Sequence, residues 1–283
     1  MHQRRGCLSF DFIEKSMLKV LLKGASMRFF SFIFILTAAL IANAGMKTEW
    51  IDYKDGATVM RGYLAYDDAN KAPRPGVLIV HDWMGMGANP KMRAEKVAAL
   101  GYVAFAADIY GVDHIPKNQD EASKTAGEFK NDRKLLRKRA SLAMDVLKKQ
   151  KNVDIKKLSV MGYCFGGTTA LELARSGAPI KGVISFHGGL ATPNPEDAKN
   201  IKGKVLALHG GDDPFVKHDE VDAFQKEMRD AKIDWQFVSY GGAVHSFTIA
   251  EAGSDNSKGA AYNKQADERS WEAMKNFFNE IFM

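Results

Sequence analysis

The sequence predicts an α/β fold built on one mostly parallel central sheet of about eight strands, with helices on both faces. Two observations predict it. Short apolar runs alternate with amphipathic helical segments along most of the chain, and the later runs are nearly continuous in Val, Ile, Leu and Ala. Such runs are typical of strands covered on both faces. A strand, a helix and a further strand in succession imply right-handed crossovers and parallel neighbours.

The expected elements follow in order along the chain. Only the short turn KDGA separates the first two apolar runs, so an antiparallel pair is expected to begin the sheet. We expect strands at 48–53, 58–66, 76–81, 102–107, 157–161, 180–186, 204–209 and 234–240. We expect helices at about 90–99, 119–150, 165–175, 218–231 and 262–281. The Gly- and Pro-containing stretch 187–202 is expected to be a surface loop.

Residues 1–44 are expected to be an N-terminal extension and a secretory signal peptide that is removed, which leaves 45–283 as a single domain. An apolar run spans 29–42 and is followed by Ala-Asn-Ala, the small-x-small pattern that signal peptidase cuts. The run is shorter than the about 20 residues of a membrane span. We therefore expect a periplasmic or secreted protein with no stable membrane insertion after cleavage. A retained anchor is the alternative, and translation could begin at Met1, Met17 or Met27.

The charge of the chain is concentrated in this extension. Residues 1–44 hold six Lys/Arg and two Asp/Glu, so the formal net charge of +6 falls to +2 for residues 45–283. A nearly neutral domain does not predict nucleic-acid binding, which needs a basic face. The basic cluster RKLLRKR at 133–139 remains. With Leu135 and Leu136 facing inward on a helix, this cluster is expected to be a solvated face.

Cys164 is the single cysteine of residues 45–283, because Cys7 lies in the predicted extension. Cysteines of exported proteins are usually paired in disulfides. A lone thiol in that compartment therefore indicates a reactive group.

Polar side chains gather just after the predicted strands. Parallel strands all point the same way, so residues that follow them meet along one edge of the sheet, where α/β proteins bind their ligands. These residues are His81, Asp82, Trp83, Asp108, Cys164, His187, His209, Asp212, Asp213 and His245. The set is rich in nucleophiles, bases and carboxylates, so the edge is the expected active site.

The segment GYCFGG at 162–167 predicts a nucleophile elbow around Cys164. Glycines two residues before and two after a residue at a strand-to-helix turn allow a strained, crowded backbone that projects the reactive atom. The partial positive charge at the N-terminus of the following helix favours thiolate over thiol. The Phe165 N–H, the first after the nucleophile, is the expected oxyanion donor. A small buried cysteine in a tight turn is the alternative.

Two later segments supply the partners that such a nucleophile needs. LHGGDDPFV at 208–216 offers Asp212 and Asp213, and SYGGAVHSF at 239–247 offers His245. Each segment follows an apolar strand and precedes a helix. His245 is expected to take the thiol proton and pass it to the leaving group, while Asp213 holds the ring in the required tautomer.

Together with HDWMG after the third strand and AADIYG after the fourth, these segments resemble the dienelactone hydrolase family of α/β hydrolases. The resemblance covers essentially all of 45–283. It implies an α/β-hydrolase fold and a catalytic triad of Cys164, Asp213 and His245, with the Trp83 N–H as second oxyanion donor. It implies a hydrolase of ester or lactone bonds that forms an acyl-thiol intermediate on a small-molecule substrate.

Two positions depart from the family's pattern. Asp82 replaces a glutamate that pairs with the resting cysteine in the family. Asp82 is therefore the expected acid that pairs with the Cys164 thiol, although its side chain is one methylene shorter. The arginine that holds the substrate carboxylate four residues after the histidine is replaced by Ile249, and Lys124 is one candidate substitute. The reaction type therefore transfers to this chain better than the substrate does.

Other interpretations remain open from the sequence. His81, His187 and His209 with Asp82 and Asp212 suggest a metal site, although neither HxH nor HExxH spacing occurs, so no metal or other cofactor is expected. The chain could also be a general carboxylesterase without dienelactone activity, or a ligand-binding relative without catalysis. A thiol redox protein would ordinarily need a resolving cysteine. The natural substrate and the oligomeric state do not follow from the sequence.

Overall fold

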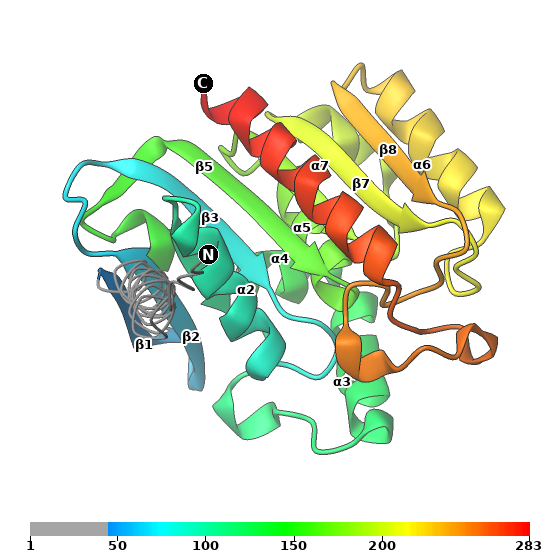
Figure 1. Ribbon diagram of the computed structural model, residues 1–283, viewed down its shortest axis with the longest axis horizontal. Coiled ribbons are helices and arrows are strands. Elements are labelled where there is room, and N and C mark those ends of the chain that lie inside the picture. The colour runs from blue at the N-terminus through cyan, green and yellow to red at the C-terminus, as the bar shows by residue number, and fades with distance from the viewer. Residues whose placement is uncertain (1–44) are drawn as a thin grey trace, which may run out of the picture. The chain divides into compact units, whose positions relative to one another are not determined.

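The computed structural model describes residues 45–283 and contains one eight-stranded sheet in the order β1-β2-β4-β3-β5-β6-β7-β8 (Figure 1). The predicted extension and signal peptide, 1–44, lie outside the described residues. The strands are β1 (Met46–Asp55), β2 (Thr58–Asp67), β3 (Arg74–Val80), β4 (Val103–Ala107), β5 (Val153–Tyr163), β6 (Gly182–Phe186), β7 (Lys204–Gly210) and β8 (Trp235–Tyr240). β1 pairs antiparallel with β2 and β2 antiparallel with β4, whereas all the other pairs are parallel.

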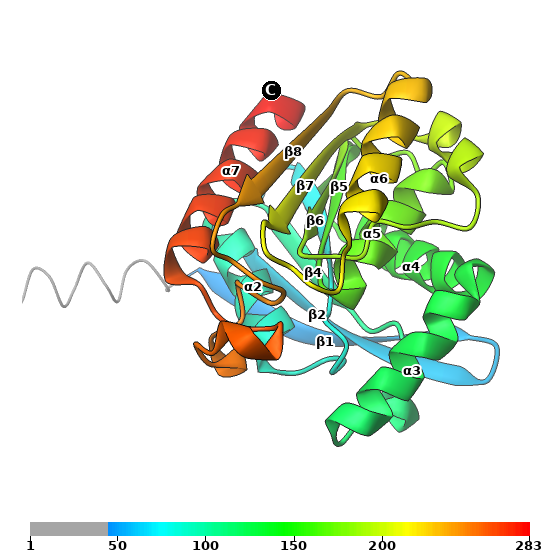
Figure 2. The same ribbon diagram turned by 90° about the vertical axis from the view of Figure 1, so that its right-hand side faces the viewer.

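Helices cover both faces of the sheet, as predicted. They are α2 (Ala88–Ala99), α3 (Gln119–Asn131), α4 (Arg133–Lys148), α5 (Phe165–Arg175), α6 (His218–Asp230) and α7 (Lys264–Phe282), with short 3-10 turns at Val112–His114, Pro195–Asn200, Ala250–Ala252 and Asn256–Lys258. Figure 2 shows α2 and α7 on one side of the sheet and α4, α5 and α6 on the other. Each layer buries its own apolar cluster against the strands. The α/β prediction, with its antiparallel opening pair, is confirmed.

The predicted helix at 119–150 is wrong in one respect, because it is two helices. The backbone leaves helical geometry at Asp132, with φ −109° and ψ 77°. The Asp132 carboxylate accepts a hydrogen bond from Leu135 N at 2.9 Å and so caps α4. Aspartate satisfies free N–H groups at a helix start better than it serves a helix interior, and apolar periodicity alone does not show such a break.

The basic cluster at 133–139 is not a simple solvated face. The Arg139 side chain is buried, and its Nη1 donates to the carbonyl oxygens of Ile109 and Tyr110 at 2.8 and 2.6 Å. Arg137 Nε donates to Glu172 Oε2 at 2.8 Å. These contacts join α4 to the loop after β4 and to α5, so the cluster is partly structural.

The predicted surface loop at 187–202 is buried at its start. His187 and Gly188 are buried, and Thr168 Oγ1 in the first turn of α5 donates to the Gly189 carbonyl at 2.9 Å. The rest of the stretch is largely exposed and contains the 3-10 turn Pro195–Asn200. The loop therefore packs directly beside the start of α5.

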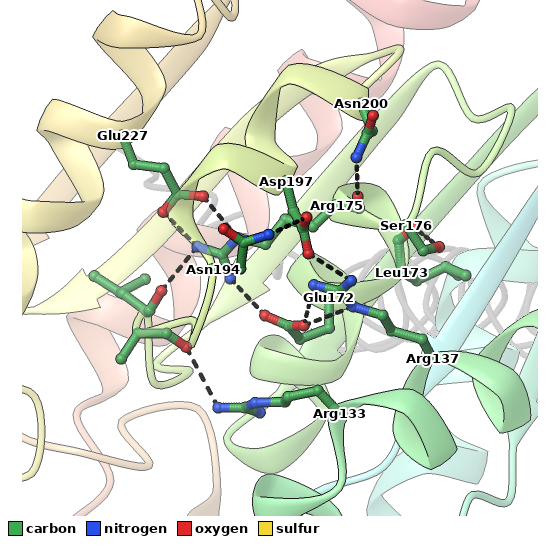
Figure 3. A network of polar contacts seen from close by, with 12 residues as sticks. Arg133, Arg137, Glu172, Leu173, Arg175, Ser176, Asn194, Asp197, Asn200 and Glu227 are labelled. Carbon is green, nitrogen blue, oxygen red and sulfur yellow. Dashed lines mark hydrogen bonds and ion pairs between the residues drawn. The ribbon is translucent and has the colours of Figure 1, made fainter.

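A buried polar network fixes α5, the helix that follows Cys164, to its surroundings (Figure 3). Arg175 in the last turn of α5 donates to both carboxylate oxygens of Glu227 on α6, at 2.8 and 2.7 Å. It also donates to Glu172 Oε1 at 3.0 Å and to the Leu190 carbonyl at 2.9 Å. The Arg175 and Glu172 side chains are fully buried. The network thus connects α5, α6 and the loop after β6.

No helix within residues 45–283 is long and apolar enough to cross a membrane.

Replacing Arg175 by methionine is expected to lower the free energy of unfolding by about 3–5 kcal/mol, because Glu172 and Glu227 would stay buried with the charge of Arg175 removed. Denaturant unfolding measures the change. Lys226→Met is the matched control, because it breaks the exposed ion pair of Lys226 with Asp230 and should cost at most about 1 kcal/mol. Equal effects of the two substitutions would contradict a structural role for the network.

Candidate active site

Cys164 lies in a strained turn between β5 and α5. Its φ of 54° and ψ of −116° are unusual for a residue with a side chain. A Cβ on Gly162 would lie 2.0 Å from the Gly166 carbonyl oxygen, and one on Gly166 would lie 2.3 Å from the Val80 carbonyl oxygen. Neither position accepts a side chain, which is the crowding that the glycine spacing predicts. Cys164 is a free, partly exposed thiol.

The structure brings Cys164, Asp213 and His245 together although they are far apart in the chain. His245 Nε2 lies 3.1 Å from Cys164 Sγ, and His245 Nδ1 donates to Asp213 Oδ2 at 2.7 Å. The other Asp213 oxygen accepts from Phe215 N at 2.8 Å. The carboxylate orients the imidazole, and the imidazole presents its second nitrogen to the sulfur.

The interaction between Cys164 and His245 shifts the pKa of both side chains. Burial alone raises the pKa of the Cys164 thiol, but the adjacent His245 charge and hydrogen bond outweigh it, so the pKa is below its ordinary value. Burial alone lowers the pKa of His245, but Cys164 and the Asp213 hydrogen bond outweigh that effect and raise it. Each pKa is therefore shifted in the direction that favours the charged form of its group.

Two backbone amides at this edge of the sheet have no acceptor among residues 45–283. They are the N–H groups of Trp83, after β3, and of Phe165, the first residue of α5. The Trp83 carbonyl accepts from the Tyr110 hydroxyl at 3.2 Å. Unpaired amides beside a nucleophile suit the oxygen that becomes negative during acyl transfer.

Tyr110 is a site residue that the sequence reasoning did not single out. Its ring packs against those of His81 and Phe165, with centroids 4.6 and 5.1 Å apart. Burial raises the pKa of its hydroxyl, and the charges of Cys164 and Asp82 add to this effect. Its position just after β4 could have indicated a place in the site, because residues that follow the parallel strands meet at this edge of the sheet.

The Asp82 side chain is buried but makes no hydrogen bond to the thiol. Its Oδ1 accepts from Met84 N at 2.8 Å, and its Oδ2 accepts from Asn89 Nδ2 at 3.4 Å. Its charge still opposes ionisation of Cys164. The pairing of Asp82 with the resting thiol therefore stays a prediction, because Asp82 makes no direct contact with Cys164.

Of the three histidines that end strands, His81 and His187 have hydrogen-bond partners, whereas the His209 ring packs against Phe237 with the centroids 5.4 Å apart and its Nδ1 has no partner within residues 45–283. His81 Nδ1 donates to the Asp82 carbonyl at 2.6 Å, and its Nε2 accepts from Ile109 N at 3.1 Å. His187 Nε2 lies 2.8 Å from Thr248 Oγ1 and its ring packs edge-on against His245, with the centroids 5.3 Å apart. Within residues 45–283, no cluster of three or more His, Cys, Asp or Glu side chains is arranged to hold a metal ion.

Ile249 lies in the turn directly after His245, where its N–H donates to the Ser246 carbonyl at 2.9 Å. Lys124, the candidate substitute for an arginine there, is exposed on α3. Lys130, also exposed on α3, is the lysine whose charge helps to lower the pKa of Cys164.

The fold and the arrangement of Cys164, Asp213 and His245 define the chain as an α/β hydrolase. The family model of the dienelactone hydrolase family matches residues 60–282. The chain belongs to this family, which confirms the resemblance found in the sequence, and the predicted hydrolase class agrees with the membership.

Individual relatives cover most of the described chain. A putative carboxymethylenebutenolidase of Saccharolobus solfataricus is 28% identical over 83% of this chain and 99% of its own length. A solved structure described as m3DLH is 40% identical, with a TM-score of 0.81 over 85% of this chain and 100% of that one. A dienelactone hydrolase-like promiscuous phosphotriesterase from metagenomic libraries is 42% identical, with the same TM-score and coverage.

Alkylation of Cys164 by iodoacetamide should show the coupling with His245. A thiol pKa below the ordinary value of 9.0 raises the thiolate fraction at any given pH, so the alkylation rate should fall with a midpoint below that value as the pH is lowered. His245→Asn removes the imidazolium, so the midpoint of the rate–pH profile should move up toward the ordinary value. An unchanged midpoint would contradict the coupling, and His114→Asn, at an exposed histidine, is the control.

Proposed function

We propose that the protein hydrolyses carboxylic ester or lactone bonds with Cys164 as nucleophile, His245 as proton carrier and Asp213 as the group that orients His245. The observation that carries the proposal is the single imidazole that contacts both the Asp213 carboxylate and the Cys164 sulfur. Membership of the dienelactone hydrolase family supports it.

The first half of the proposed reaction is acylation. The thiolate attacks the carbonyl carbon, a C–S bond forms, and the carbonyl electron pair moves to the oxygen. The Trp83 and Phe165 N–H groups stabilise that oxyanion, each by on the order of 3 kcal/mol. As the oxyanion collapses, the C–O bond breaks, and the His245 imidazolium gives its proton to the departing oxygen. An acyl-thiol and a neutral imidazole remain.

Deacylation restores the resting pair. Neutral His245 takes a proton from water, and the resulting hydroxide attacks the acyl-thiol carbon. The C–S bond then breaks to release the carboxylic acid product and the thiolate. Asp213 holds His245 in the same tautomer through both halves. A thiolate expels poor leaving groups slowly, so activated esters, enol lactones and thioesters suit the site better than amides do.

A general carboxylesterase without dienelactone activity is the second candidate function. The observation that favours it is Ile249, which places an apolar side chain in the turn after His245 where a carboxylate-binding arginine would otherwise be expected.

Cys164→Ala is expected to reduce hydrolysis of an activated aryl ester at least about a thousandfold, because it removes the group that forms the acyl-thiol. Cys164→Ser should leave weak activity at most. In the unchanged protein, rapid quenching and peptide mass spectrometry should place the acyl group on Cys164. A fully active Cys164→Ala protein would refute the assignment, and loss of activity with EDTA but not with iodoacetamide would indicate a metal instead.

We also propose export with removal of residues 1–44, on the strength of the apolar run and its Ala-Asn-Ala ending. Expression of the full chain in a Gram-negative host should yield a periplasmic protein whose first residue is Gly45. N-terminal sequencing of that fraction checks the cleavage site. Ala44→Asp should block cleavage, and a cytoplasmic product that retains residues 29–42 would contradict the proposal.

A further inference from the structure

The catalytic edge carries an unusual share of exposed apolar side chains. Large hydrophobic residues that are exposed within 45–283 are Trp50, Met84, Leu100, Ile115, Ile155, Phe215 and Met283. Met84, Ile115 and Phe215 all belong to loops that follow the carboxyl ends of strands β3, β4 and β7. An exposed apolar cluster beside a nucleophile is a surface for an apolar part of a ligand.

These side chains flank Cys164 on two sides. In the sheet order β4-β3-β5-β6-β7, the nucleophile follows β5, so the loops that carry Met84 and Ile115 follow strands on one side of it and the loop that carries Phe215 follows a strand on the other. The first two loops touch, because a Cβ on Gly85, the residue after Met84, would be 3.8 Å from Ile115 Cγ2. Ile249, from the loop after β8, adds a partly buried apolar side chain on the side of Phe215.

Phe215 packs against His245 although its side chain is largely exposed. Its ring stands edge-on to His245, with the centroids 5.5 Å apart and the planes at 86°. On its inner side the ring also abuts Gly259, where a Cβ would lie 3.0 Å from Phe215 Cζ. The Phe215 N–H donates to Asp213 at 2.8 Å. The residue nevertheless remains 61% exposed, so much of an aromatic ring beside His245 is open to a ligand.

The place of Phe215 indicates which part of the substrate it meets. In the proposed reaction His245 gives its proton to the departing oxygen, which must therefore lie within a hydrogen bond of the imidazole. Any group attached to that oxygen leaves the site past the residues beside His245, and Phe215 is the aromatic residue there. An apolar or aromatic leaving group would cover the exposed ring face, whereas a charged one would lose water without gaining a partner from it.

Resting on the proposed function, we propose that the site selects uncharged esters with an apolar, preferably aromatic, leaving group, and that Phe215 is the residue that selects it. Lys130 is the feature that favours the opposite preference, because its exposed charge acts on Cys164 and could attract an anionic substrate. The test must therefore compare neutral and anionic leaving groups directly.

Three acetate esters provide that comparison: phenyl acetate, β-naphthyl acetate and para-carboxyphenyl acetate. All three form the same acetyl-thiol, so deacylation is common to them and differences in kcat/KM report the steps in which the leaving group is bound and expelled. The purified protein should favour the naphthyl over the phenyl ester by about tenfold in kcat/KM, the value expected for one further apolar ring contact. The para-carboxyphenyl ester should be the poorest of the three.

Phe215→Ala should reduce the naphthyl-to-phenyl ratio to about one or two, whereas Phe215→Tyr should keep it. The ratio is the readout because any disturbance of His245 slows both esters equally. Ile155→Ala is the matched control, since Ile155 is 62% exposed at the opposite end of its strand and should leave the ratio unchanged.

Three outcomes would overturn the proposal while leaving the proposed hydrolase intact. They are a wild-type ratio near one, an equal loss for both esters in Phe215→Ala, and a preference for the para-carboxyphenyl ester that Lys130→Gln removes. Failure of the hydrolase itself would look different, because none of the three esters would be cleaved and no acetyl group would appear on Cys164.

Discussion

The site depends on one contact, that of the His245 imidazole with the Cys164 sulfur. The sulfur reaches the imidazole because the backbone at Cys164 takes a conformation that is costly for a residue with a side chain. The glycines at 162 and 166 permit that conformation, since the neighbouring carbonyl groups leave no room for any Cβ there. The buried network around Arg175 holds the other end of α5, so the helix that begins beside the sulfur is fixed at both ends.

Burial and charge have opposite effects on the pKa values of Cys164 and His245. Burial alone would make the Cys164 thiol and the His245 imidazole both neutral, because a low-dielectric environment disfavours either charge. Mutual attraction reverses both tendencies, and the Asp213 hydrogen bond adds to the effect on the imidazole. The lowered pKa of Cys164 therefore depends on its pairing with His245 and not on the cysteine alone.

The positions of the strands along the chain and the catalytic edge could be predicted because they depend on local sequence patterns that all agree. Apolar runs, glycine spacing and the order of Cys164, Asp213 and His245 each constrain the same sheet edge. Features that depend on contacts between distant parts of the chain could not be predicted from the sequence. The break at Asp132 competes with a continuous helical pattern, and the burial of Arg139 depends on two carbonyl groups about thirty residues away in the chain.

The same limit applies within the site. The sequence placed Asp82 at the correct edge of the sheet. Its side chain, however, accepts a hydrogen bond from the nearby Met84 N and does not contact the thiol. Tyr110 could not be predicted as a site residue, because a tyrosine after a strand forms no recognisable motif with its neighbours in the sequence. Its place in the site is shown only by its contacts with Trp83 and Phe165.

The elbow and the loops around it differ in how freely they can change over evolution. Gly162 and Gly166 admit no larger residue, so descendants that keep this turn must keep both glycines. Met84, Ile115 and Phe215 are exposed on loops, where replacements cost little stability. New substrates can therefore be acquired by single changes around an invariant turn, which makes the chain a suitable starting point for laboratory selection of altered specificity.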